Sequence, residues 1–291
     1  MGKTYLLLDC DYLCHRALHS TGGLSFHGSA TGVMYGFLKS LSVFQDLFDT
    51  SNFVFCWDSR KSKRLELYPE YKANRHKKDK YTDAELEFYR AFKEQMKLLR
   101  TTYLPTIGFG NVFVQRGYES DDVIASLASD FLLDSCFGEG RPEAVIISSD
   151  KDLYQCISHN VSYYNPQTSK TLTLQSFKKQ YGIVPEGWGT MKALAGCTTD
   201  NVKGIKGVGE KRAIDFILKR LKPDSKAYAA ITSQKGDAIY AFNKELVVLP
   251  MKGTQHFKIG EDNLSEQGWK KVTKLLGMKS IRDKMPFGRR R

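Results

Sequence analysis

The chain has 291 residues, of which 41% are hydrophobic and 26% are charged. This is ordinary globular composition, with enough residues for a sizeable core in one large or two modest domains. The 44 Lys and Arg residues against 32 Asp and Glu residues give a net charge of +12, which favours a polyanionic partner over an indifferent basic surface without excluding the latter. The first apolar run, Tyr5–Leu8, is too short for a signal peptide or a membrane span, so we expect no membrane partner.

Apolar segments typical of buried strands alternate with amphipathic segments through the first two-thirds of the chain. Strands are predicted over residues 5–9, 53–58 and 144–148, and helices over residues 32–48 and 120–131, where apolar residues recur at helical spacing. Because continuous apolar strands are separated by helices, we expect an α/β fold with a mainly parallel central sheet flanked by helices.

Two regions depart from this pattern. Residues 60–80 hold nine Lys or Arg and three acids, so we expect this segment to lie outside the core. From residue 186 onward the chain is typical of helices joined by glycine-rich turns, and the tail Arg289–Arg291 is expected to be disordered. Six cysteines lie without CxxC spacing, which argues against a zinc site and indicates a reducing cytoplasm.

Acidic residues follow the predicted strands. Asp9 and Asp58 follow the first two strands, Asp150 and Asp152 follow the third, and the start of the second helix adds Glu119, Asp121 and Asp122. The carboxyl ends of parallel strands lie at one edge of a sheet, where ligands bind. Taken singly, these acids could cap helices or open turns.

Together, such acids would raise one another's pKa values and would need cations. Oxygen ligands without His or Cys clusters suit Mg²⁺ or Mn²⁺. Two ions about 3.5–4 Å apart are typical of phosphodiester hydrolysis.

Two further segments indicate nucleic-acid binding. In the stretch Tyr68–Arg75, aromatic rings stand among Lys and Arg residues, which suits base stacking and phosphate contacts; a solvated charged helix is the alternative. In residues 204–209 glycines permit a tight turn at a helix N-terminus, where backbone N–H groups could approach a phosphate. Glu210 stands where a nucleoside-triphosphate loop would require Lys, so that motif is excluded.

Together these residues resemble the 5′-nuclease family, which includes flap endonucleases, phage 5′-3′ exonucleases and the 5′-nuclease domain of bacterial DNA polymerases. The resemblance runs from Tyr5 to Phe216 and rests on Leu8-Asp9, Trp57-Asp58, Pro69–Arg75, Glu119–Asp122, Ser149–Asp152 and Thr199–Asn201.

The resemblance implies a PIN-like fold in two parts. Residues 1–185 would form the nuclease domain, with a helical arch over about 60–98, and residues 186–291 a helix-hairpin-helix-like DNA-binding region with the glycine turn 204–209 and a basic tail. The implied activity is a metal-dependent, structure-specific 5′ nuclease that uses two metal ions in DNA replication or repair. Its substrate would be flap, nicked or gapped DNA with free 5′ ends, and we expect a monomer in the cytoplasm of a bacterium or a phage-infected host.

The resemblance also implies roles for individual residues. The first metal ion would be held by Asp9, Asp58, Glu119, Asp121 and Asp150, and the second by Asp152 and Asp200, with Asp122 supporting the cluster. Lys72 and Arg75 would act with Asp150 in catalysis by contacting the scissile phosphate, and Tyr71 would stack on a terminal base. Duplex DNA would be gripped at Gly204, Lys206, Gly207, Gly209, Lys211 and Arg212, with K⁺ at the glycine turn.

One position departs from the family pattern, which has Gly-Asp-x-x-Asp-Asn before the glycine turn. Here the segment is Gly196-Cys197-Thr198-Thr199-Asp200-Asn201, and a neutral thiol is a poor Mg²⁺ ligand. A DNA-binding protein of the same fold with a decayed second metal site is therefore an alternative. A PIN-like ribonuclease is another, although the glycine turn and the long basic segment argue against it.

Overall fold

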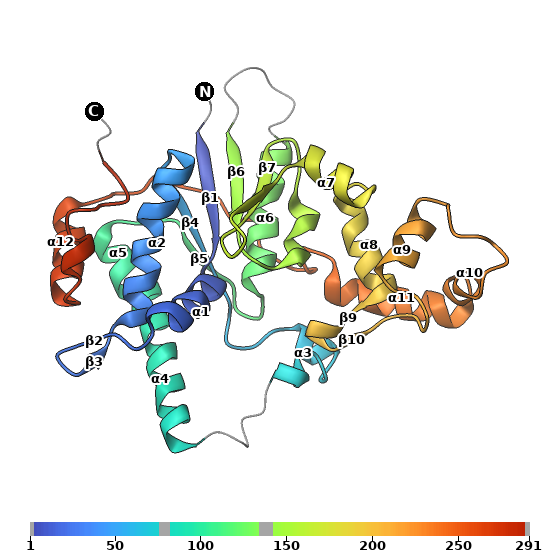
Figure 1. Cartoon of the computed structure of the whole chain (residues 1–291), viewed down its shortest axis with the longest axis horizontal. Coiled ribbons are helices and arrows are strands. Elements are labelled where there is room, and N and C mark those ends of the chain that lie inside the picture. Colours follow the sequence, from blue (N-terminus) through green and yellow to red (C-terminus); the bar gives the residue numbers. More distant parts are fainter. Residues whose placement is uncertain (1–2, 76–81, 134–141, 289–291) are drawn as a thin grey trace.

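The computed structural model describes residues 3–75, 82–133 and 142–288. The tail Arg289–Arg291, for which we expected disorder, lies outside these residues. A six-stranded sheet in the order β5-β4-β1-β6-β7-β8 forms the centre of the molecule (Figure 1). All pairs are parallel except β7 with β8, which confirms the expected α/β fold.

The three strands expected from the sequence are present within one residue of the predicted bounds. The sheet consists of β1 Thr4–Asp9, β4 Asn52–Trp57, β5 Val112–Val114, β6 Glu143–Ile147, β7 Val161–Asn165 and β8 Lys170–Leu172. Two small hairpins are formed by β2 Ser25–Phe26 with β3 Ser29–Ala30, and by β9 Gly196–Cys197 with β10 Val202–Lys203.

The strands are apolar on both faces because helices cover both faces of the sheet. Leu6 and Leu8 of β1 enter one core, and Leu7 between them enters the other, as strand alternation requires. The first core is completed by α1 Cys10–Thr21, α2 Gly32–Phe48, α4 Asp83–Leu98, α5 Leu104–Ile107 and α12 Glu266–Leu275. The second core is completed by α6 Ser120–Leu133, α7 Leu174–Tyr181, α8 Glu186–Ala195, α9 Glu210–Ile217 and α10 Lys226–Ile231, while α11 Gln234–Val247 packs on α8.

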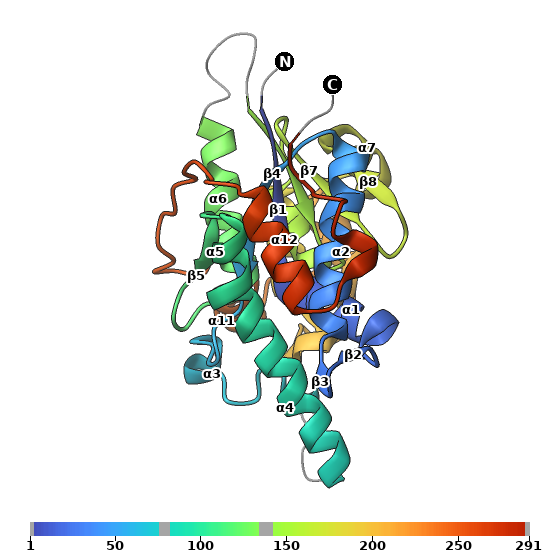
Figure 2. The same ribbon diagram turned by 90° about the vertical axis from the view of Figure 1, so that its left-hand side faces the viewer.

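The C-terminal region packs back onto the α/β layer. Trp269 of α12 is fully buried in the first core, and α12 lies beside α5 (Figure 2). Ile205 and Val208 of the glycine turn belong to the second core. Residues on both sides of the predicted boundary at 185 therefore share the same two hydrophobic cores, so this boundary does not separate two cores.

The predicted arch region, 60–98, contains α3 Arg64–Leu67, a short 3-10 helix at Ala73–Arg75 and α4. Residues 76–81 of this region are not among the residues that the structure describes. The expectation that residues 60–80 lie outside the core is wrong for Arg64 and Tyr71, whose exposed fractions are 1% and 4%. Their polar groups pair with buried carboxylates, described below, which makes this burial possible.

Within the described residues, none of the helices has the length and apolar character needed to cross a membrane.

Candidate functional site

A cavity of about 1060 Å³ opens at the carboxyl edge of the central sheet. It brings together Asp9 at the end of β1, Asp58 after β4, Asp121 in the first turn of α6 and Asp150 after β6. These four carboxylates come from separate parts of the chain, and their convergence is the arrangement that the strand-end pattern predicts.

Two serines hold these carboxylates in place. Ser148 Oγ donates a hydrogen bond to Asp9 Oδ2 at 2.7 Å and accepts one from the Asp150 amide at 3.0 Å. The Ser120 amide donates to Asp58 Oδ1 at 2.7 Å. Because Ser148 follows β6 and Ser120 begins α6, the sheet edge and the helix start fix the carboxylates relative to one another.

Asp11 is a fifth carboxylate of this group and was not among the predicted site residues. It lines the cavity, and its Oδ2 accepts a hydrogen bond from the Asp58 amide at 2.8 Å. The spacing Asp9-Cys10-Asp11 could have drawn attention to it. Here and below, we call Asp9, Asp11, Asp58, Asp121 and Asp150 the first carboxylate group.

Burial and mutual repulsion make Asp9, Asp11 and Asp121 of the first carboxylate group hard to ionise. Burial, followed by the charge of Asp58, raises the pKa of Asp9 to about 7 and that of Asp11 to about 8. Burial and the charge of Asp150 raise the pKa of Asp121 well above its ordinary value. A divalent cation would relieve this repulsion, and a set of oxygen donors alone fits Mg²⁺ or Mn²⁺.

A second set of possible ligands lies beside the first. Atoms of Asp152, Cys197 and Asp200 lie within 4.8 Å of one another. However, Lys192 Nζ lies 2.8 Å from Asp152 Oδ1 and 3.8 Å from Cys197 Sγ, and Arg75 Nη2 donates to Asp200 Oδ1. Both carboxylates are thus already paired with cations from the chain itself.

The thiol of Cys197 adds no charge to this second set. Burial, and then the charge of Asp152, raise its pKa, so the neutral form is favoured at neutral pH. Cys197 also packs in a small apolar cluster with Tyr71 and Val202. The second set therefore fits a divalent cation less well than the first carboxylate group. Lys192 was not predicted, since nothing in its local sequence distinguishes it from a solvated lysine.

Glu119 lies at the base of the predicted arch, paired with cations. Lys72 Nζ lies 2.9 Å from Glu119 Oε2, and the Tyr71 hydroxyl donates to the same oxygen at 3.1 Å. Although burial opposes it, the charges of Lys72 and Arg64 lower the pKa of Glu119. Glu119 is therefore a carboxylate that ionises more readily than Asp9 and Asp11.

Tyr71 is not placed to stack on a base in this structure. Its side chain is buried, and its hydroxyl donates to Glu119 and to Asp200 Oδ2, the latter at 3.3 Å. Two carboxylates hold the hydroxyl inside the protein in this structure, and the stacking of a terminal base on this ring stays a prediction. Lys72 and Arg75, by contrast, both line the cavity.

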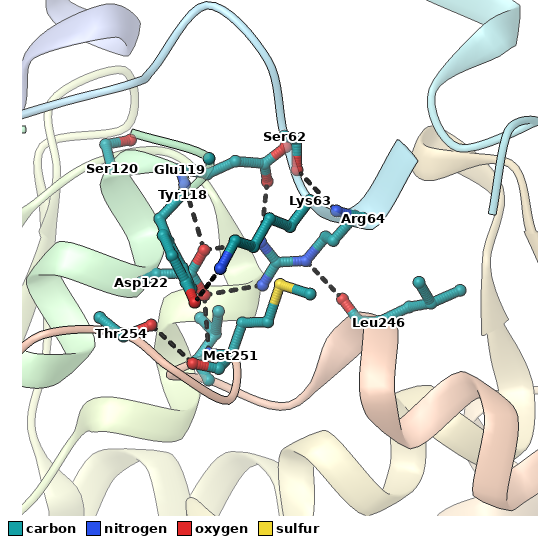
Figure 3. A network of polar contacts seen from close by, with 12 residues as sticks. Ser62, Lys63, Arg64, Tyr118, Glu119, Ser120, Asp122, Leu246, Met251 and Thr254 are labelled. Carbon is teal, nitrogen blue, oxygen red and sulfur yellow. Dashed lines mark hydrogen bonds and ion pairs between the residues drawn. The ribbon is translucent and has the colours of Figure 1, made fainter. Parts of the chain in front are cut away.

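Asp122, predicted to support the cluster of metal ligands, is closed off from the cavity. Its carboxylate is fully buried and pairs with Arg64, whose Nη1 and Nη2 donate at 2.6 and 2.7 Å (Figure 3). Arg64 Nε donates to the Leu246 carbonyl at 2.7 Å, and the Met251 amide donates to Asp122 at 2.9 Å. Asp122 therefore supports the site by holding α3, α6 and the end of α11 together, rather than as a ligand.

The glycine turn forms as expected before α9. A side chain at Gly204 would collide with the Ala195 carbonyl, and Gly207 has a φ of +81°. The Gly207 carbonyl accepts a hydrogen bond from Arg212, and Gly209 lines the cavity. The cationic residues Lys206, Lys211 and Arg212 are exposed, as DNA contacts would require.

Comparison with known proteins places this arrangement among nucleases. Residues 4–182 match the family described as "5′-3′ exonuclease, N-terminal resolvase-like domain". The chain is 32% identical to a 5′-3′ exonuclease of Aquifex aeolicus over 75% of this chain and 70% of that protein. It is 28% identical to a 5′-3′ exonuclease of Mycoplasmopsis pulmonis, with 94% of this chain and 91% of that protein covered.

Longer relatives and solved structures are also similar. The chain is 32% identical to thermostable DNA polymerase I of Thermus thermophilus over 76% of this chain, but it spans only 26% of that enzyme. The D15 protein of bacteriophage T5, crystallised with metal ions, has the same fold with a TM-score of 0.67 at 20% identity, covering 98% of this chain and 97% of that chain. A flap endonuclease from Methanococcus jannaschii gives a TM-score of 0.53 at 14% identity, with 99% and 88% covered.

Proposed function

Because this chain belongs to the 5′-3′ exonuclease family, we propose that it is a structure-specific 5′ nuclease of DNA replication or repair. It would hydrolyse phosphodiester bonds near free 5′ ends, as a flap endonuclease or a 5′-3′ exonuclease. The observation that carries this proposal is the convergence of the first carboxylate group in a large cavity that also receives Lys72 and Arg75.

The first carboxylate group would hold one divalent cation, Mg²⁺ or Mn²⁺, which would polarise the scissile phosphate. Lys72 and Arg75 would place positive charge on the phosphate oxygens when DNA enters the cavity. In this structure Lys72 pairs with Glu119 and Arg75 pairs with Asp200. Substrate binding would then exchange one set of anionic partners for another, so each cation would always have a partner.

A second cation at Asp152 and Asp200 is the less well supported part of the metal proposal, since Lys192 and Arg75 already pair with these residues. The same pairing favours a second candidate function, a structure-specific DNA-binding protein of this fold with one weakened metal site. All five members of the first carboxylate group line the large cavity, however, which supports the nuclease.

For the DNA itself, the glycine turn would grip duplex phosphates through Lys206, Lys211 and Arg212, with K⁺ bound to backbone oxygens there. The substrate would be a flap, nick or gap bound by a single copy of the chain. The bacterial origin of the exonuclease relatives supports work in the cytoplasm of a bacterium or of a phage-infected cell.

The test is cleavage of a labelled 5′-flap DNA, of its RNA counterpart and of the same duplex without a flap, in Mg²⁺, in Mn²⁺ and in excess EDTA. We expect DNA cleavage near the 5′ end that requires a divalent cation. Binding without cleavage in either metal would favour the DNA-binding candidate. Preferential cleavage of the RNA flap would favour a PIN-like ribonuclease.

A further inference from the structure

A second cavity, of about 350 Å³, lies beside the base of the predicted arch. Tyr68 and Lys203 line it together with Lys235 and Phe242 of α11. The two segments that contribute Tyr68 and Lys203 also line the large cavity, through residues 72, 75 and 197–199. The two cavities are therefore lined by neighbouring residues of the same two segments. None of the residues assigned to the nuclease lines the second cavity.

Phe242 presents an apolar ring to this cavity. It is 45% exposed, and its ring meets the Tyr68 ring nearly at right angles, with 5.7 Å between the centroids. The next residue, Asn243, is buried and donates to the carbonyls of Ala193 and Lys203, both at 2.9 Å. These bonds fix α11 against α8 and β10, so the partly exposed phenyl ring stands on a rigid support.

Charge at this cavity is positive. Lys203 and Lys235 are both exposed at its wall, and within the described part of the chain no acidic residue lines it. Aromatic rings beside lysines are the combination that binds single-stranded nucleic acid, since rings stack on bases while ammonium groups neutralise phosphates. An apolar peptide would leave both lysines without a counter-charge.

We propose that this cavity binds one unpaired nucleotide of the 5′ strand, with its base against Phe242 and Tyr68 and its phosphate between Lys203 and Lys235. The proposal rests on the nuclease function proposed above and names a contact that would distinguish flapped from unflapped ends. The 5′ strand is the occupant because Tyr68 begins the segment whose Lys72 and Arg75 would engage the cleaved strand.

The test measures DNA binding by fluorescence anisotropy in EDTA, which separates binding from cleavage. Three DNA molecules are compared: a duplex with a normal 5′ flap, the same duplex with an abasic flap, and the duplex without a flap. We expect Phe242→Ala to weaken binding of the normal flap about 5- to 150-fold. The unmodified protein should bind the abasic flap as weakly as the Phe242→Ala variant binds the normal flap. The substitution should not weaken binding of the abasic flap any further.

Matched variants separate stacking from general apolar contact. Phe242→Trp should retain the affinity for the normal flap, whereas Phe242→Leu, which keeps an apolar side chain, should lose it. Lys235→Ala should lower the salt dependence of flap binding by about one counterion, while Lys274→Ala on the distant helix α12 should not. Melting curves should change little for Phe242→Ala, since that side chain is 45% exposed and belongs to no buried cluster of the described residues.

Equal affinity of Phe242→Ala and the unmodified protein for the normal flap would overturn the proposal, as would an equal loss on the duplex without a flap. The same measurement on a duplex with a 3′ flap in place of the 5′ flap tests the strand, and a loss on this DNA without a loss on the 5′ flap would overturn the assignment to the 5′ strand. Cleavage at saturating DNA in Mg²⁺ is measured in parallel. If cleavage is present but the flap effects are absent, the cavity proposal fails while the nuclease stands; if cleavage is absent, the nuclease fails independently of these binding results.

Discussion

Arg64 and Asp122 form a bidentate ion pair that is buried from solvent, with each guanidinium Nη atom within 2.7 Å of a carboxylate oxygen. The pair joins α3 at the arch base to the first turn of α6, where Glu119 and Asp121 reach toward the cavity. Arg64 Nη1 also lies 3.6 Å from Glu119 Oε2. One buried cation thus fixes the position of a cavity-lining carboxylate without itself reaching the cavity.

We expect Arg64→Ala to lower the free energy of unfolding by about 3–5 kcal/mol, because Asp122 would remain buried without its partner. The measurement is chemical denaturation followed by circular dichroism. Arg60→Ala, at an exposed position of the same basic segment, is the control and should change stability by less than about 0.5 kcal/mol. Similar stabilities for the two variants would mean that the pair is dispensable to the fold.

Asp150→Asn should reduce cleavage of 5′-flap DNA to background while leaving DNA binding intact or stronger. The substitution removes one negative charge from the first carboxylate group and leaves the glycine turn and Arg212 untouched. Single-turnover cleavage and anisotropy on the same DNA make the comparison, with the exposed Asp283→Asn as the control. Retained cleavage would remove Asp150 from the metal-binding set.

The first carboxylate group predicts how stability depends on pH when no metal is present. The folded-state pKa values of Asp9 and Asp11, about 7 and 8, lie above the unfolded value of 3.8. The folded state therefore holds more protons between these values, and its stability should fall as the pH rises from about 4 to 8, by the order of a few kcal/mol. Thermal melting in EDTA measures this loss, and added Mg²⁺ should reduce it; a flat profile in EDTA would contradict the prediction.

Lys72→Ala and Arg75→Ala should lower the single-turnover rate by about 100-fold while weakening DNA binding far less. A cation at the scissile phosphate acts on charge that develops in the transition state. Lys97→Ala, exposed on α4, is the control. Equal losses in rate and affinity would make both residues ordinary phosphate contacts.

Cys197→Asp tests the second set of ligands. A third carboxylate beside Asp152 and Asp200 would outnumber the cations that now balance them, so we expect a tighter second ion and a faster Mg²⁺-supported rate. The measurement is a Mg²⁺ titration of flap cleavage with melting curves in Mg²⁺ and in EDTA, and Cys197→Ser is the neutral control. A lower melting temperature that Mg²⁺ does not restore, with no gain in rate, would show that position 197 serves only the small apolar cluster.

The sequence predicted the ends of β1, β4 and β6 well because each of these strands is apolar on both faces and an acid ends it or follows it within three residues. It did not predict which acids face the cavity. Asp122 sits beside Asp121 in the sequence, but the helix turns it toward Arg64, a partner 58 residues away. The sequence neighbours of Arg64 are typical of a solvent-exposed cation, so its burial could not be predicted. The environments of Lys192 and Phe242 likewise form only through contacts between segments that are distant in the sequence.

The packing of α12 has a consequence for dissecting this protein into pieces. Within the described chain, α12 contributes no residue to the large cavity. Yet a fragment ending at residue 182, where the family match ends, would lose Trp269, Val272 and Phe287 from the first core and would expose the surface of α5 against which α12 packs. Each lost side chain forfeits about 1.5–3 kcal/mol of burial, so such a fragment should aggregate although it retains all five acids of the first carboxylate group.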